Sequence, residues 1–129
     1  MSGRFLPPDH SRGDANTIGG YAAVHARPAA FEGSDGMSYS VEIVVDETGI
    51  VGRPFGAYLL FMRWRRIGAQ GIEGHLETDY LAYGASEEAA RATVGAMTLG
   101  DVNAVLETLI REQAANRPSR RWWDAMRDE

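Results

Sequence analysis

Apolar and polar residues alternate along four stretches of the chain, as in strands that turn one face to a core. The clearest stretch is 37–46, and the other three are 21–27, 56–66 and 71–84. In 37–46 the expected core-facing residues are Tyr39, Val41, Ile43 and Val45. In the others they are Ala22, Val24 and Ala26, then Tyr58, Leu60, Met62 and Trp64, and finally Ile72, Leu76, Thr78, Tyr80 and Ala82. The pattern therefore predicts four strands.

Beyond the last of these stretches the apolar spacing changes to the three- and four-residue repeat of helices. Ser86 is a good N-cap for a helix over 86–95. Thr98 and Asp101 have the spacing of a capping box, which predicts a second helix over 98–115. The apolar stripe of that helix consists of Leu99, Val102, Val105, Leu106, Leu109 and Ile110. Asn116 and Pro118 are expected to end it.

Four sequential strands followed by two helices predict an α+β fold, with a four-stranded antiparallel meander and two C-terminal helices packed on one face. The chain has 129 residues, of which 44% are hydrophobic, and this favours a single core formed by residues 20–115. Residues 1–19 are rich in polar residues, Gly and Pro, so we expect a flexible N-terminal arm. Residues 116–129 form a C-terminal tail rich in Arg and Trp.

Composition excludes several classes of chemistry. The chain contains no cysteine, which excludes disulfides, thiolate zinc sites and cysteine nucleophiles. All 13 basic residues are arginine, which excludes a Schiff-base lysine. The net charge of -5 disfavours nucleic-acid and membrane partners. No apolar run is long enough for a signal peptide or a membrane span, so a cytoplasmic protein is expected.

The fourth predicted strand carries the sharpest candidate for chemistry. Glu73, His75 and Glu77 alternate along it, so their side chains are expected on one face at about 7 Å spacing. Together with His25 they are candidate ligands of a divalent metal, or groups for acid/base catalysis. No other cofactor is expected. The alternative is a solvated face on which these acids form salt bridges with arginines.

Arg63 and Arg65 are candidate contacts for an anion, because a guanidinium group binds carboxylates through two parallel hydrogen bonds. We expect them on the same face as Leu59 and Phe61 and beside the acids of the fourth strand. Two apolar residues on a charged face suggest a cover, which would be the N-terminal arm, a second copy of the protein or a ligand.

The C-terminal tail is the second candidate surface. Arg120, Arg121, Trp122 and Trp123 are residue types that anchor protein interfaces. The tail would then dock a partner; alternatively, one tryptophan fills the protein's own core. Binding of nucleic acid by the same residues is disfavoured by the neighbouring Asp and Glu residues.

These features favour a small soluble binding or assembly module without catalytic activity of its own, acting as a homodimer or with a protein partner. The alternative is a small metal-dependent or acid/base enzyme that uses the charged face of strand 72–83.

Overall fold

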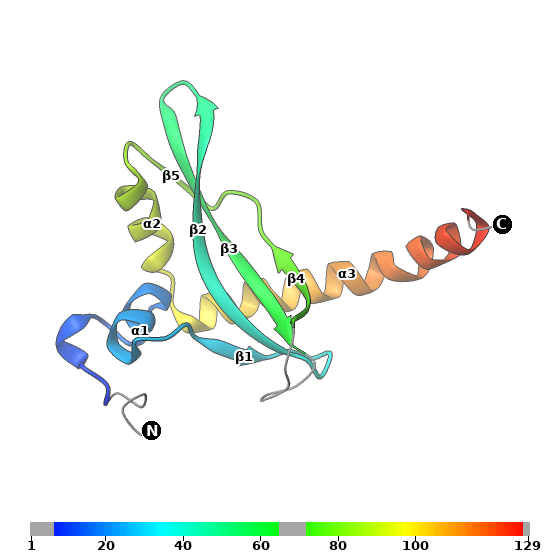
Figure 1. Ribbon diagram of the computed structural model, residues 1–129, viewed down its shortest axis with the longest axis horizontal. Helices are drawn as coiled ribbons and strands as arrows, with labels where there is room; N and C mark the ends of the chain where they lie inside the picture. Colours follow the sequence, from blue (N-terminus) through cyan, green and yellow to red (C-terminus); the bar gives the residue numbers. More distant parts are fainter. Residues whose placement is uncertain (1–6, 65–71, 128–129) are drawn as a thin grey trace.

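The computed structural model describes the backbone of residues 7–64 and 72–127, and the side chains of residues 7–64 and 74–115. Its elements, labelled in Figure 1, are a short 3-10 helix η2 (His10–Arg12), α1 (Ile18–His25), β1 (Ala30–Glu32), β2 (Ser38–Ile50), β3 (Arg53–Trp64), β4 (Ile72–Glu77), β5 (Ala82–Gly84), α2 (Glu87–Gly95) and α3 (Leu99–Arg127). The fold is α+β, as predicted.

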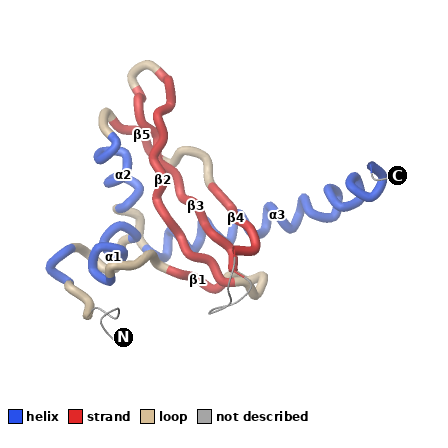
Figure 2. Tube along the Cα trace, in the orientation of Figure 1, coloured by secondary structure: helices blue, strands red, loops and turns tan. Residues whose placement is uncertain are grey.

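The sheet is antiparallel and has the order β1, β2, β3, β4, so the predicted meander is confirmed. The short strand β5 pairs with the N-terminal end of β3, beyond the end of β4. β2 and β3 form a long hairpin whose tip extends past the other strands (Figure 2). Gly49 and Gly52 flank this tip with positive φ angles of 75° and 83°, which glycine adopts without strain.

The predicted strand over 21–27 is wrong, because these residues belong to helix α1. Thr17 caps the helix by accepting a hydrogen bond from the Gly20 N–H at 3.0 Å. Alternation of small alanines with larger residues does not distinguish a strand from a helix, and alanine favours the helix. The first strand is instead β1, which pairs with the start of β2.

Part of the predicted N-terminal arm packs on the domain. Asp9 donates its backbone N–H to the Val24 carbonyl at 2.9 Å. Thr17 forms an isolated bridge with Thr98, and the side chain of Ile18 is buried. Residues 7–19 are therefore tied to α1 and to the start of α3.

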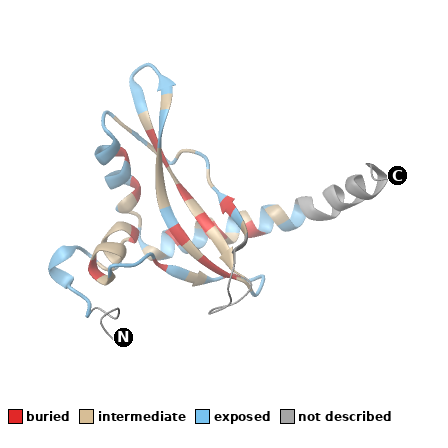
Figure 3. Ribbon diagram, in the orientation of Figure 1, coloured by how far each residue is buried: buried red, intermediate tan, exposed pale blue. Residues whose placement is uncertain are grey.

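The buried face of β3 is the opposite of the predicted one. Ala57, Leu59 and Phe61 are buried, whereas Tyr58, Leu60, Met62 and Trp64 are only half-buried (Figure 3). Both faces of this strand are apolar, so its alternation alone could not decide between them. The register decides it: Phe61 lies opposite Val41, and Leu59 lies opposite Ile43, on the predicted core face of β2.

The two C-terminal helices begin as predicted. Ser86 caps α2 by accepting from the Ala89 N–H at 3.0 Å. Thr98 and Asp101 form the reciprocal bonds of a capping box, at 3.0 Å and 3.3 Å. The predicted stripe of α3 packs on the core, with Val102, Leu106 and Ile110 buried.

The predicted end of the second helix is wrong, because the backbone of α3 continues past Asn116 and Pro118 to Arg127. Proline removes one backbone hydrogen bond, but here it does not stop the helix. None of the helices in the described ranges has the length and apolarity that crossing a membrane requires.

Candidate docking surface on the open face of the sheet

Helices α2 and α3 pack on one face of the sheet, and α1 packs against α2. Their buried side chains form one cluster with Tyr39 and Val41 of β2 and with Leu59 and Phe61 of β3. In Figure 1, α3 passes behind the strands. Within the described part of the chain, no helix packs on the opposite face, which we call the open face.

The open face carries a row of large apolar side chains along its centre. The register places Met62 opposite Ser40, and Tyr58 opposite Val44, on this face. The row is half-buried and consists of Val44, Tyr58, Leu60, Met62 and Trp64. Trp64 is fixed by a hydrogen bond from its Nε1 to the Ser40 hydroxyl at 3.1 Å. Acidic residues border the row, so the open face combines an apolar centre with a charged edge.

His75 and Glu77 lie together on the open face, as their spacing predicted. His75 stands opposite Met62, and Glu77 stands opposite Leu60. The imidazole Nε2 lies 3.9 Å from a Glu77 carboxylate oxygen, with 59% and 52% of the two side chains exposed. An ion pair this exposed contributes little to stability. Since more than half of each side chain is exposed, a partner can reach both groups.

Arg63 does not lie beside these acids, and that part of the prediction is wrong. It occupies the helix-covered face, where its Nη1 donates to the Gln113 side-chain oxygen at 3.0 Å. The reason is a bulge: Trp64 pairs with Ile72 but Arg63 pairs with Gly74, which leaves Glu73 as an extra residue in β4. A strict two-residue alternation therefore does not hold across Glu73. The Glu73 side chain and the whole of Arg65 lie outside the described residues.

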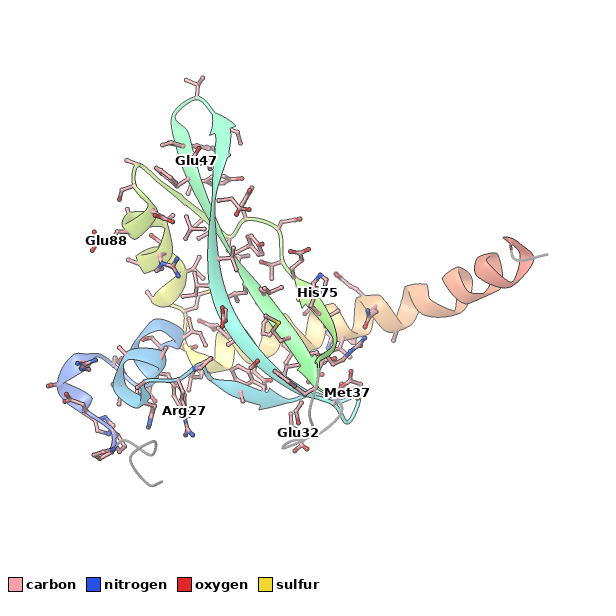
Figure 4. All side chains as sticks on the ribbon, viewed as in Figure 1. Arg27, Glu32, Met37, Glu47, His75 and Glu88 are labelled. Atoms are coloured by element: carbon pink, nitrogen blue, oxygen red, sulfur yellow. The ribbon has the colours of Figure 1, made fainter. Side chains whose placement is uncertain are left out.

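His25 is on helix α1 and not on an outer strand as predicted. Its ring lies 4.3 Å from that of Tyr21 and 6.2 Å from that of His10. In Figure 4, Arg27, two residues further along, lies well apart from His75. Among the side chains that the structure describes, no group of three His, Cys, Asp or Glu could hold a metal ion. The proposed combination of His25 with His75 and Glu77 is therefore not formed.

The candidate partner-binding residues Arg120, Arg121, Trp122 and Trp123 belong to the C-terminal end of α3. Their side chains lie outside the described residues. The helix carries their backbone past the edge of the sheet (Figure 1).

One feature of the open face was missed by sequence reasoning. A cavity of about 450 Å³ lies where β4 leads into β5. Its lining residues are Asp46, Tyr58, Glu77, Thr78, Asp79, Tyr80 and Tyr83. Tyr58 and Tyr80 had been predicted to face the core, which hid the cluster. The signal available in the sequence was the succession of acids and tyrosines over 77–83.

Comparison of the chain with protein-family models, with curated proteins and with solved structures finds no match.

Proposed function

We propose that the protein is a binding module without catalytic activity of its own, and that two copies associate by docking the C-terminal end of α3 on the open face of the partner. The observation that carries this proposal is the apolar row of the open face, which no helix of the described chain covers. Contiguous apolar surface with a polar border is typical of protein interaction sites.

Charge complementarity favours the end of α3 as the occupant. The open face carries the acids Glu42, Asp46 and Glu77. The sequence of residues 116–129 contains four arginines, three acids, of which two are the last two residues, and the large apolar residues Trp122, Trp123 and Met126. Tryptophan and arginine are the residue types that contribute most at interfaces. An acidic edge around an apolar row suits a segment of this composition.

The course of α3 supports contact between two copies. Its N-terminal half packs on the helix-covered face, and the backbone then continues as one helix beyond the sheet (Figure 1). This course leads residues 116–127 away from the open face of their own copy. A reciprocal exchange would give a twofold dimer with two equal contacts.

The molar mass of the full chain in solution tests this proposal. We expect a dimer by light scattering, and dissociation in the Trp122→Ala/Trp123→Ala variant. Met62→Glu, which puts a charge in the apolar row, should weaken association at least about tenfold, or about 1.4 kcal/mol. Val51→Glu is the matched control, because Val51 is 99% exposed at the hairpin tip and outside the row.

A wild-type chain that stays monomeric up to about 100 μM would contradict the proposal, since interfaces of ordinary size bind at micromolar concentration or below. Equal effects of Met62→Glu and Val51→Glu would also contradict it. Circular dichroism of each variant separates loss of association from loss of the fold.

A further inference from the structure

The cavity at the end of the open face has walls of two kinds. Three tyrosine rings, those of Tyr58, Tyr80 and Tyr83, contribute aromatic surface. Asp46, Glu77 and Asp79 contribute carboxylates. No basic side chain is among the described residues that line it. The residues that line the cavity are therefore acidic and aromatic.

The tyrosines form a connected group around Tyr80. The ring centroid of Tyr80 lies 6.0 Å from that of Tyr58 and 5.7 Å from that of Tyr83, at angles of 65° and 57°. The Tyr80 hydroxyl donates to an Asp46 carboxylate oxygen at 3.1 Å. Rings and acid are thus held in one arrangement.

The Tyr80 ring packs directly on the backbone of β3 at Gly56. A Cβ atom at Gly56 would lie 2.7 Å from the Tyr80 ring, so only glycine lets the ring rest on the strand. The connection from β4 to β5 is bound to β3 on both sides of Tyr80. Thr78 accepts from the Leu59 N–H at 3.1 Å, and Leu81 donates its N–H to the Ala57 carbonyl at 2.8 Å.

The acidic side chains of the lining favour a cation over an anion. Desolvation, and then the hydrogen bond and charge of Asp46, raise the pKa of Tyr80 above its ordinary value. Desolvation, followed by the charges of Asp46 and Glu77, raises the pKa of Tyr58. Both phenols therefore stay neutral near pH 7, and the faces of neutral aromatic rings attract cations.

We infer that this cavity binds the guanidinium group of an arginine side chain. A guanidinium stacks on tyrosine rings and binds carboxylates through its planar set of N–H groups. Tyr83 already accepts such a group, because the Arg53 guanidinium carbon lies 5.0 Å from its ring centroid.

This inference rests on the proposed function in one respect: the arginine that enters the cavity comes from a second copy of the chain. All 13 basic residues of the chain are arginine, so a second copy supplies this cation and no lysine. The candidates within its docking segment are Arg117, Arg120, Arg121 and Arg127. The cavity itself can be tested with a small molecule.

The test is a titration of the full chain followed by two-dimensional NMR. The probe is Nα-acetyl-arginine methylamide, and the comparison is its uncharged citrulline analogue. Arg117, Arg120, Arg121 and Arg127 are changed to Gln in the titrated protein, so that a docked segment cannot occupy the cavity. We expect shifts of the cavity residues with the arginine probe alone. Tyr80→Leu and Asp46→Asn should each weaken binding about two- to fivefold.

Glu88→Gln is the matched control, because Glu88 is an exposed acid in the first turn of α2 (Figure 4). Equal binding of the citrulline analogue, or unchanged binding to Tyr80→Leu, would overturn the inference. Equally tight binding of tetramethylammonium would overturn the assignment to guanidinium. If the arginine probe binds but the wild-type protein is monomeric in solution, only the proposed docking function is refuted. A wild-type dimer without probe binding would refute only the cavity.

Discussion

At the scale of single residues, the buried side chain of Tyr39 makes the stability of the fold depend on pH. Its side chain is fully buried, and its hydroxyl donates to an Asp35 carboxylate oxygen at 2.6 Å. Burial, followed by the hydrogen bond to Asp35, raises the pKa of Tyr39 from 10.0 to about 12. The folded state therefore holds this proton more tightly than the unfolded chain does.

The direction of the resulting pH dependence follows from linkage. A group whose pKa is raised on folding contributes stability below its unfolded pKa, and that contribution is lost as the pH rises towards the folded pKa. We expect the free energy of unfolding of the wild type to fall between pH 10 and about 12. Tyr39→Phe should fall less steeply, after an initial loss of about 1 kcal/mol at pH 7 from the missing hydrogen bond.

Urea denaturation at several pH values measures both quantities. Tyr21→Phe is the control, because Tyr21 is only partly buried at the margin of the core and loses a hydroxyl in the same way. Parallel stability curves for the wild type and Tyr39→Phe across this window would show that Tyr39 is not the group responsible.

At the scale of elements, α1 and α2 approach closely through two glycines. A Cβ atom at Gly19 would lie 3.0 Å from the Gly95 Cα and 3.2 Å from its carbonyl oxygen. Both are backbone atoms, so the helices would have to separate. A Cβ atom at Gly100 of α3 would meet only the Thr98 hydroxyl, at 3.8 Å.

Substitution by alanine is therefore expected to have opposite effects on stability at Gly19 and at Gly100. Gly100→Ala should raise the free energy of unfolding by about 0.5 to 1 kcal/mol, the usual gain of alanine over glycine in a helix. Gly19→Ala should lower it by about 1 kcal/mol or more, because the overpacked contact outweighs that gain. Thermal and urea denaturation of both variants give the comparison. A stabilised Gly19→Ala variant would mean that α1 is free to move away from α2.

Elements whose signals are local were predictable from the sequence. The caps at Ser86 and Thr98 depend on hydrogen bonds between residues three apart, and both form. The buried face of β3 was not predictable, because it depends on pairing with β2 and both of its faces are apolar. The alanines of α1 alternate with larger residues, so the helix was predicted as a strand.

The same distinction applies to the candidate site. His75 and Glu77 share a face because they are two residues apart in one strand. Their relation to Arg63 depended on the register between β3 and β4, which the bulge at Glu73 shifts by one residue. The tyrosines of the cavity come together only through the pairing of β2, β3 and β5 with the connection after β4.

At the scale of the whole molecule, reciprocal docking predicts that two defective variants restore each other. In Met62→Glu the open face is damaged and the C-terminal segment is intact, whereas in Trp122→Ala/Trp123→Ala the reverse holds. Each variant alone lacks one half of both contacts and should form homodimers much more weakly than the wild type. A mixture pairs the intact face of one variant with the intact segment of the other, so one of the two wild-type contacts forms.

Analytical ultracentrifugation of the mixture, with one variant fluorescently labelled, measures this association. We expect a heterodimer that is weaker than the wild-type dimer, because one contact lacks the second that reinforces it. Added salt should weaken it further, since acids of the face meet arginines of the segment. Two variants that fail to associate when mixed would contradict reciprocal docking. A dimer in which two open faces meet directly makes a different prediction: Trp122→Ala/Trp123→Ala, whose open face is intact, would still form a dimer by itself.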